Sequence, residues 1–153
     1  MKIIILSVGK IKDIHLCALA ERYVKRTRSF LTIGQEFVPE AKDRDRNRKI
    51  EKEGDELLKR VQSRDFVVTL EENGEERDSE AFARWLGELI DGTPGRILFI
   101  VGGAFGLSQR VCARRDASVS LSKMTLPHEF CPVLLAEQIY RSFTILRGGE
   151  YHH

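Results

Sequence analysis

Short, uninterrupted runs of apolar residues constrain the fold of this chain more than any other feature. Three of them lie at residues 3–8, 66–70 and 97–101. A strand that is covered on both faces has no polar side, so such runs are typical of a buried parallel sheet. Between the runs, apolar side chains recur with helical spacing. This alternation predicts an α/β fold with a mainly parallel sheet and helices on both faces.

The remaining elements follow from spacing and from capping residues. Two more strands are expected at 32–38 and 118–121. Five helices are expected, which begin near Asp13, after Asn47, after Asp78 or Ser79, after Ser108 and near Pro132. The spacing of the first helix turns Ile14 inward, and Asn73-Gly74 predicts a turn after the third strand. With 153 residues and no repeat or linker, residues 1–153 are expected to form a single domain.

The composition, with 42% hydrophobic and 31% charged residues, fits a globular protein. No apolar run approaches the ~20 residues of a membrane helix, and the first run is too short for an export signal. The three cysteines, Cys17, Cys112 and Cys131, are far apart, and no Cys-x-x-Cys or zinc spacing occurs. We therefore expect no membrane partner, no metal, a reducing cytoplasmic location, and cysteines that serve in packing.

The positive residues are clustered, although the net charge is only +2. Arg22, Lys25 and Arg26 lie near the end of the first helix, and bases alternate with acids from Lys42 to Lys49. Each cluster is either a solvated face or an approach surface for a polyanion. The segment 41–47 is expected to be a mobile loop.

A glycine turn follows the strand at 97–101, with Gly102, Gly103 and Gly106. Its pattern is G-G-x-x-G, whereas the dinucleotide-binding fingerprint is G-x-G-x-x-G. Lys123 also occupies the position at which that fingerprint requires a ribose-binding acid. No Walker A sequence occurs either. The glycines are explained by a tight strand-to-helix turn alone, or by a ligand that lies on the backbone.

The loop from Ser122 to Pro127 holds no metal ligand and no nucleophile beside a base. It combines backbone polar groups with the apolar side chains of Leu121, Met124 and Leu126, which suits a flat heteroaromatic ring. A buried connecting loop is the alternative. Farther on, Glu137 and Arg141 are four residues apart and share a helix face, as an ion pair or as part of a site.

Together these phrases resemble the RlmH family of SPOUT methyltransferases, which methylate N3 of a pseudouridine in 23S (large-subunit) ribosomal RNA. The resemblance covers the whole chain. The segments that carry it are Gly102–Ser108, Leu121–His128, Ala136–Arg141 and Tyr151-His152, with Val8-Gly9 and Val68–Leu70 in support.

The resemblance implies a deep C-terminal trefoil knot, a homodimer, S-adenosylmethionine as cofactor, and ribosomal RNA within assembled ribosomes as substrate. The residues that it implies for donor binding are Leu70, Gly102, Gly103, Leu121, Ser122, Lys123, Met124, Thr125 and Leu126. Of these, Gly102 would contribute by leaving space.

The tail carries the implied chemistry. Family members tend to end in Tyr-His and a basic residue, so the resemblance favours a native His153 over an affinity-tag remnant. Removal of the N3 proton needs a base, for which His152 or His153 is the candidate, with Glu137 as the alternative if it is buried. Arg141 is expected to hold a phosphate or the charge of the deprotonated ring.

The expected RNA contacts are Tyr151, which would stack on a base, and Arg22, Lys25 and Arg26, which a dimer would bring near the partner's tail. Two other functions stay open. One is a non-catalytic RNA- or ribosome-binding module of the same fold. The other is a nucleotide-binding oxidoreductase, which the missing ribose-binding acid disfavours.

Overall fold

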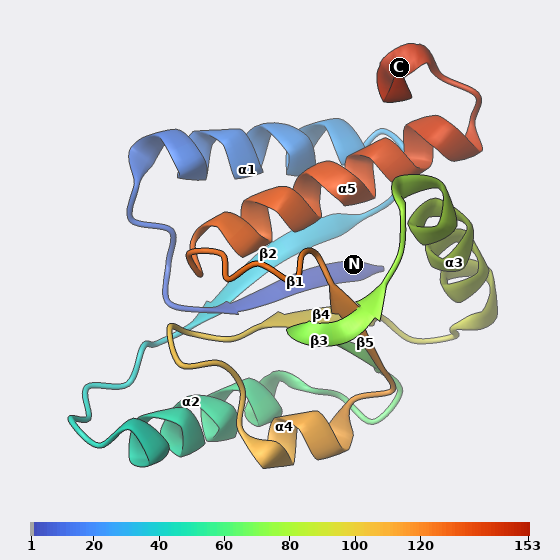
Figure 1. The fold of residues 1–153 in the computed structure, drawn as a ribbon. Helices are drawn as coiled ribbons and strands as arrows, with labels where there is room; N and C mark the ends of the chain where they lie inside the picture. The colour runs from blue at the N-terminus through green and yellow to red at the C-terminus, as the bar shows by residue number, and fades with distance from the viewer. Residues whose placement is uncertain (1) are drawn as a thin grey trace.

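A five-stranded sheet organises the computed structural model, which describes residues 2–153 (Figure 1). Every pairing between neighbouring strands is parallel, as the apolar runs predict. The strands are β1 (Ile3–Val8), β2 (Ile33–Val38), β3 (Phe66–Glu76), β4 (Ile97–Val101) and β5 (Ala117–Ser120). Their spatial order is β2-β1-β4-β3-β5, so β5 lies at one edge and β2 at the other.

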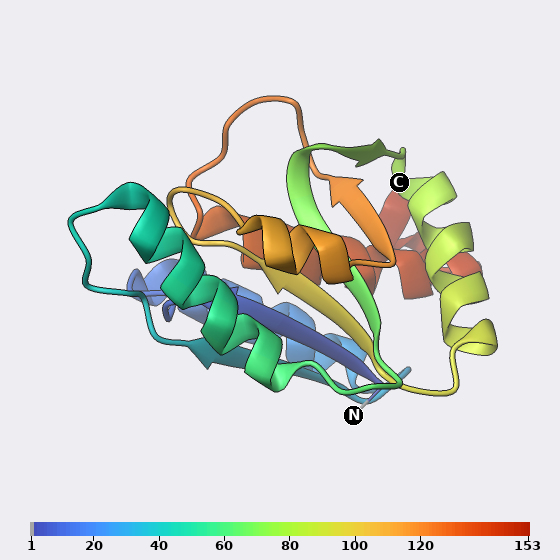
Figure 2. The same ribbon diagram turned by 90° about the horizontal axis from the view of Figure 1, so that it is seen from below.

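Helices cover both faces of the sheet, which confirms the predicted architecture. The helices are α1 (Ile14–Thr27), α2 (Arg46–Arg60), α3 (Ser79–Gly92), α4 (Gln109–Arg114) and α5 (Phe130–Leu146), and a 3₁₀ helix, η1 (Glu150–His152), follows. Helix α5 packs between α1 and α3 on one face, and α2 and α4 lie together on the other (Figure 2). Four helices begin at a side chain that accepts a backbone N–H of the first turn: Asp13, Asp45, Asp78 and Ser108.

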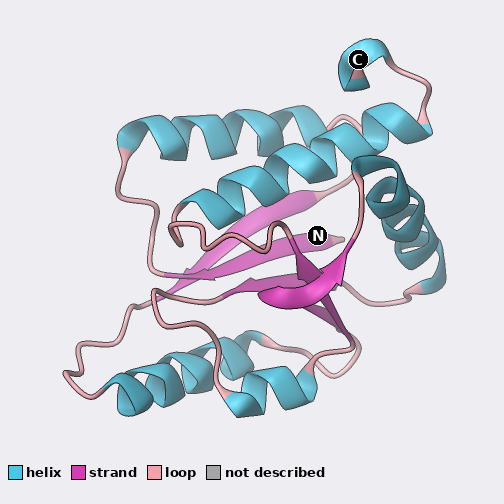
Figure 3. Ribbon diagram, in the orientation of Figure 1, coloured by secondary structure: helices cyan, strands magenta, loops and turns pink. Residues whose placement is uncertain are grey.

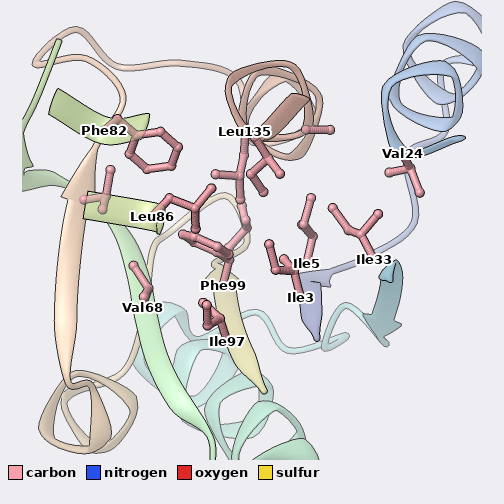
Figure 4. Close-up of a cluster of buried hydrophobic side chains, with 14 of the residues drawn as sticks. Ile3, Ile5, Val24, Ile33, Val68, Phe82, Leu86, Ile97, Phe99 and Leu135 are labelled. Carbon is pink, nitrogen blue, oxygen red and sulfur yellow. The ribbon is translucent and has the colours of Figure 1, made fainter. Parts of the chain in front are cut away.

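The core is split by the sheet into two apolar layers. In β1, Ile3 and Ile5 point toward α5, whereas Ile4 and Leu6 pack on the side of α2. The larger layer joins the strands to Leu135 and other residues of α3 and α5 (Figure 4). Because both sides of the strand are buried, no polar alternation is visible in its sequence.

Three local predictions are wrong. Asn73-Gly74 does not end β3; the strand continues to Glu76, and its pairing with β5 shifts between Leu70 and Glu75. A Cβ on Gly74 would lie 2.6 Å from the Val119 carbonyl carbon, so this glycine permits a close backbone approach at an irregularity in the strand.

The other two errors concern the N-terminal ends of α1 and α2. Ile14 is 74% exposed rather than inward, because Leu16, Cys17 and Leu19 form the apolar cluster beneath this end of α1. Helix α2 begins at Arg46, inside the segment that the sequence assigns to a loop. The connection after β2 is therefore only residues 39–45.

The connections that follow the strands gather at one end of the sheet, where the carboxyl ends of the strands lie, on the left of Figure 3. Parallel strands all end at the same edge, so the segments 9–13, 39–45, 102–108 and 121–129 meet there. Helix α5 starts at this edge and runs away from it, and the C-terminus lies at the far side (Figure 1). The trefoil knot stays a prediction. No described helix, from residue 2 onward, has the length and hydrophobicity needed to cross a membrane.

Candidate functional site

A cavity of about 820 Å³ lies at the carboxyl ends of β4 and β5, beside the middle of β3. Its walls come mainly from three segments that are far apart in the sequence: residues 70–72 of β3, the connection after β4 and the connection after β5. The lining residues include Leu70, Glu71, Gly102, Gly103, Phe105, Leu121, Ser122, Met124, Thr125, Leu126, His128 and Cys131. All residues that the resemblance implies for donor binding line this cavity except Lys123, whose ammonium lies 3.6 Å from Glu76 and whose side chain is 78% exposed.

The glycine turn forms one wall of the cavity. The N–H of Gly106 donates to the carbonyl of Gly103 at 3.1 Å, and Gly106 has a φ of +87°, which favours glycine. A Cβ on Gly102 would lie 2.9 Å from the Gly106 carbonyl. The turn itself therefore requires glycine at 102 and 106.

Gly103 has a different reason to lack a side chain. A Cβ there would lie 2.9 Å from Oε2 of Glu53 and 3.3 Å from Cγ1 of Val8, both of which belong to the protein beneath the turn. This contact gives the glycine a structural reason that does not depend on a ligand.

Glu53 was not singled out by its sequence context, yet it is only 2% exposed. Its Oε1 accepts the backbone N–H of Ala41 at 3.1 Å, and burial raises the pKa of its carboxyl group. The carboxyl group thus connects the segment 39–45 to the underside of the glycine turn.

The loop after β5 provides the facing wall. Oγ of Ser122 accepts the N–H of Met124 at 3.0 Å, which closes a short turn. Leu121 and Leu126 are half-buried, whereas Met124 is 76% exposed. The cavity therefore offers apolar side chains together with backbone polar groups, a combination that suits a flat ring with polar edges.

Several lining residues were missed by sequence reasoning. Glu71 follows Leu70 directly, and its carboxylate accepts hydrogen bonds from Thr69 at 2.5 Å and from Arg115 at 2.9 Å. Its place directly after the predicted strand 66–70 is a signal that the sequence did contain. Arg46, whose guanidinium lies 5.0 Å from the Phe105 ring centroid, could not be assigned, because only the fold brings α2 to the glycine turn.

A second polar cluster lies on α5 and the tail. Glu137 accepts two hydrogen bonds from Arg141, at 2.6 and 2.9 Å, and a third from the Tyr151 hydroxyl at 3.1 Å. The Glu137 hydrogen bond raises the pKa of Arg141, and burial raises the pKa of Tyr151. The Tyr151 ring packs edge-on against Tyr140 at 4.9 Å and under the Arg141 guanidinium at 4.8 Å. The fold therefore brings Glu137 and Arg141 together with the tail.

His152 joins this cluster. Its Nδ1 lies 3.3 Å from the Arg141 guanidinium, and its Nε2 lies 3.8 Å from Glu80. His153 is exposed, and no side-chain hydrogen bond of its ring occurs within residues 2–153. Arg22, Lys25 and Arg26 are exposed on α1, with Arg26 5.8 Å from the Tyr140 ring centroid.

The two clusters are separate within one chain. Cys131, in the first turn of α5, lines the cavity, whereas none of Glu137, Arg141 and residues 151–153 does. Arg141 is ten residues farther along the helix, which corresponds to about 15 Å along its axis. Among residues 2–153, no three or more His, Cys, Asp and Glu side chains gather in a way that could hold a metal ion.

Comparison with known proteins gives concordant results. Residues 1–152 match a family model described as "Predicted SPOUT methyltransferase". Proteins named "Ribosomal RNA large subunit methyltransferase H" are similar over essentially the whole chain. The relative from Bacteroides fragilis is 38% identical over 156 residues, covering 100% of this chain and 99% of its own. The relative from Limosilactobacillus reuteri is 36% identical over 158 residues, covering 99% of each.

A solved structure supports the fold. It is titled as that of a probable methylase family protein from Haemophilus influenzae Rd KW20, and it matches with a TM-score of 0.56 at 12% identity. The match covers 98% of this chain and 70% of that chain.

Proposed function

The chain belongs to the SPOUT methyltransferase family, and we propose that it methylates N3 of a pseudouridine in 23S ribosomal RNA. The observation that carries the proposal is the cavity at the strand ends, built from the same glycine turn and Leu121–Leu126 loop that carry the family resemblance. The relatives' names supply the class of substrate, large-subunit ribosomal RNA.

S-adenosylmethionine is the methyl donor in this proposal, and the cavity at the strand ends, called the donor cavity below, is where it would bind. The residues present fit it, because the adenine ring needs apolar walls and hydrogen bonds at its edge. Leu70, Leu121 and Leu126 offer the walls, and the backbone of residues 102–103 and 122–125 offers polar groups. Bound in the cavity, the donor supplies a methyl group on a sulfonium centre. The chain's task is then to align the acceptor nitrogen with that group and to keep water away.

The tail is proposed to take the N3 proton. A guanidinium can only donate, so Nδ1 of His152 accepts a hydrogen bond from Arg141. A neutral imidazole has one ring nitrogen that can accept, and in His152 this hydrogen bond occupies it. The Glu137 carboxylate is also occupied, by donors from Arg141, Tyr151 and Gln138. His153 keeps its lone pair, and we assign it as the proton acceptor.

In this assignment, His152, Glu137 and Arg141 position the tail, and Arg141 also stabilises the deprotonated ring. Replacement of His153 by Ala is therefore expected to lower kcat and to leave donor affinity unchanged. An unchanged kcat would transfer the role to His152.

A homodimer would complete the site. Ile14, Phe130 and Leu134 are 74%, 42% and 39% exposed, and they lie near the N-terminal ends of α1 and α5. Helix α5 reaches the cavity with Cys131 in its first turn. Burial of these side chains against a second copy would stabilise a dimer. A partner subunit in that position would bring its own tail, together with Arg22, Lys25, Arg26 and Tyr151, toward the cavity that its neighbour leaves open.

The test is methyl transfer from labelled S-adenosylmethionine to assembled ribosomes, to free large subunits and to naked 23S ribosomal RNA, followed by mapping of the modified base. We expect one pseudouridine to be methylated, with assembled ribosomes as the best substrate, which agrees with a cytoplasmic location. Donor binding without transfer to any of the three would instead support a non-catalytic module of the same fold.

A further inference from the structure

A second hollow, of about 720 Å³, lies next to the donor cavity at the carboxyl ends of β1 and β2. Building on the proposed function, we propose that this hollow binds the sugar-phosphate backbone of the substrate RNA beside the target nucleotide. Five basic side chains line it: Lys10, Lys12, Lys42, Arg44 and Lys49. The acidic side chains in its lining are Glu40 and Asp43.

Both acids are already neutralised by ion pairs. The Glu40 carboxylate lies 2.7 Å from the Lys49 ammonium and 3.9 Å from that of Lys12, and Asp43 lies 2.8 Å from Lys52. Within residues 2–153, no ion pair involves Lys10, Lys42 or Arg44. Three positive charges in the hollow are therefore available to an anion.

The hollow is physically connected to the donor cavity. Arg46 lines the donor cavity and is two residues from Arg44, which lines the hollow. The Phe105 ring of the glycine turn lies 5.0 Å from the Arg46 guanidinium and 5.5 Å from the Lys49 ammonium. Beneath this contact, Ala41 is hydrogen-bonded to Glu53. A strand of RNA with one nucleotide at the donor cavity would therefore place its neighbouring phosphates over the hollow.

The chemistry of the lining favours phosphates over bases. The hollow has one aromatic side chain, the half-buried Phe37, whereas RNA modules that read bases present exposed aromatic platforms. Lysine and arginine side chains match a repeating negative charge without reading sequence. The occupant is therefore the RNA backbone, and sequence selection belongs to other parts of the enzyme.

Arg44→Ala provides the test, and Arg64→Ala is the matched control. Both positions are exposed arginines without an ion pair in the described part of the chain, but Arg64 precedes β3 at the opposite edge of the sheet. Affinity for naked 23S ribosomal RNA would be measured over a range of salt concentrations without donor. Donor affinity would be measured by calorimetry, and KM and kcat by methyl transfer.

Arg44→Ala is expected to weaken RNA binding on the order of tenfold at 0.1 M salt and to reduce the salt slope by about one, and adding Lys42→Ala should repeat both effects. KM for RNA should rise while kcat and donor affinity stay unchanged. Equal RNA binding by Arg44→Ala and Arg64→Ala, or a loss of donor affinity in Arg44→Ala, would overturn the proposal. Failure of the wild type to methylate RNA that it binds would instead contradict the proposed function and leave the RNA-binding comparison valid.

Discussion

At the scale of single residues, the contact between Glu53 and Gly103 determines what the donor cavity tolerates. A Cβ on Gly103 would push against Oε2 of Glu53 at 2.9 Å, so Gly103→Ala must displace the turn or the carboxyl group. We expect Gly103→Ala to lower donor affinity by roughly tenfold, since a shift of the turn by tenths of an ångström misaligns its backbone polar groups. Isothermal titration with S-adenosylmethionine measures this.

The paired variant Gly103→Ala/Glu53→Asp tests the cause. The shorter acid withdraws from the added methyl group, so part of the lost donor affinity should return, and Glu53→Asp alone serves as the control. Absence of any recovery would mean that a side chain at position 103 acts inside the cavity, as the sequence alone had suggested.

Burial of Glu53 also makes a prediction about pH. Its folded-state pKa is raised above the ordinary value of 4.5 by burial, so folding favours the protonated form. The stabilising effect of that form is complete below the unfolded pKa and is lost as pH rises through the folded pKa. Glu53→Gln keeps an acceptor for the Ala41 N–H and carries no charge. The wild type therefore loses stability relative to this variant as pH rises, and the Tm of the variant minus that of the wild type should increase between pH 4.5 and pH 7.5. A constant difference would contradict the prediction.

The family resemblance predicted which segments line the cavity, but it did not predict the contacts that shape it. The residues from Leu121 to Leu126 were assigned by resemblance, and all but Lys123 line the cavity. Glu53 was missed because an acid on a charged helix is usually solvated, and only packing against Gly103 reveals its burial.

At the scale of elements, Ser108 links helix stability to the donor cavity. Its side chain is 2% exposed and accepts the Val111 N–H at 3.3 Å, which starts α4 directly after the glycine turn. Ser108→Ala should cost about 1 kcal/mol of stability, as lost N-caps do, and should also weaken donor binding because the turn loses its anchor.

The matched control is Asp78→Ala, which removes the cap of α3. Asp78 accepts the Ala81 N–H at 2.7 Å and does not line the cavity. Urea unfolding should give a similar loss of stability for the two variants, while donor affinity should fall only for Ser108→Ala. An equal loss of donor affinity in both variants would show that the cap of α4 has no specific role in donor binding.

Elements were predictable where one local signal dominated. The strand at 97–101 was predicted at its observed bounds because its apolar run is uninterrupted and is followed by glycines. The extension of β3 to Glu76 was missed because Asn73-Gly74 has the composition of a turn, and only pairing with β5 keeps it extended. Element type thus follows from the local pattern, and element length depends on the neighbouring strand.

At the scale of the whole molecule, the strand order and the arrangement of copies lie beyond local pattern. The sequence predicts a parallel sheet, but many orders of five strands satisfy the same apolar runs, and the knot came only from the resemblance. Ile14 is an example of the second limit: its side chain is 74% exposed, so residues 2–153 of one chain leave most of its apolar surface uncovered.

Leu134→Asp tests the proposed dimer. Leu134 is 39% exposed on α5, so a charge there should leave the fold intact but prevent burial against a second copy. Sedimentation is expected to give a monomer, with methyl transfer reduced at least tenfold if two chains form the site. The control is Lys59→Asp, an exposed position on α2 on the opposite face of the sheet, which should remain dimeric. A monomeric wild type would refute the dimer directly.

Mixing two inactive variants decides whether the site combines two chains. Gly103→Val disables the donor cavity, and His152→Ala/His153→Ala disables the tail, which packs against Arg141, about 15 Å along α5 from Cys131 at the cavity. If the tail of one copy serves the cavity of the other, a mixed dimer has one intact site. Co-refolded mixtures should then regain about a quarter of wild-type methyl transfer, since half of the dimers are mixed and each has one of two sites working. Sites confined to one chain would give no recovery, and the separately refolded variants provide the baseline.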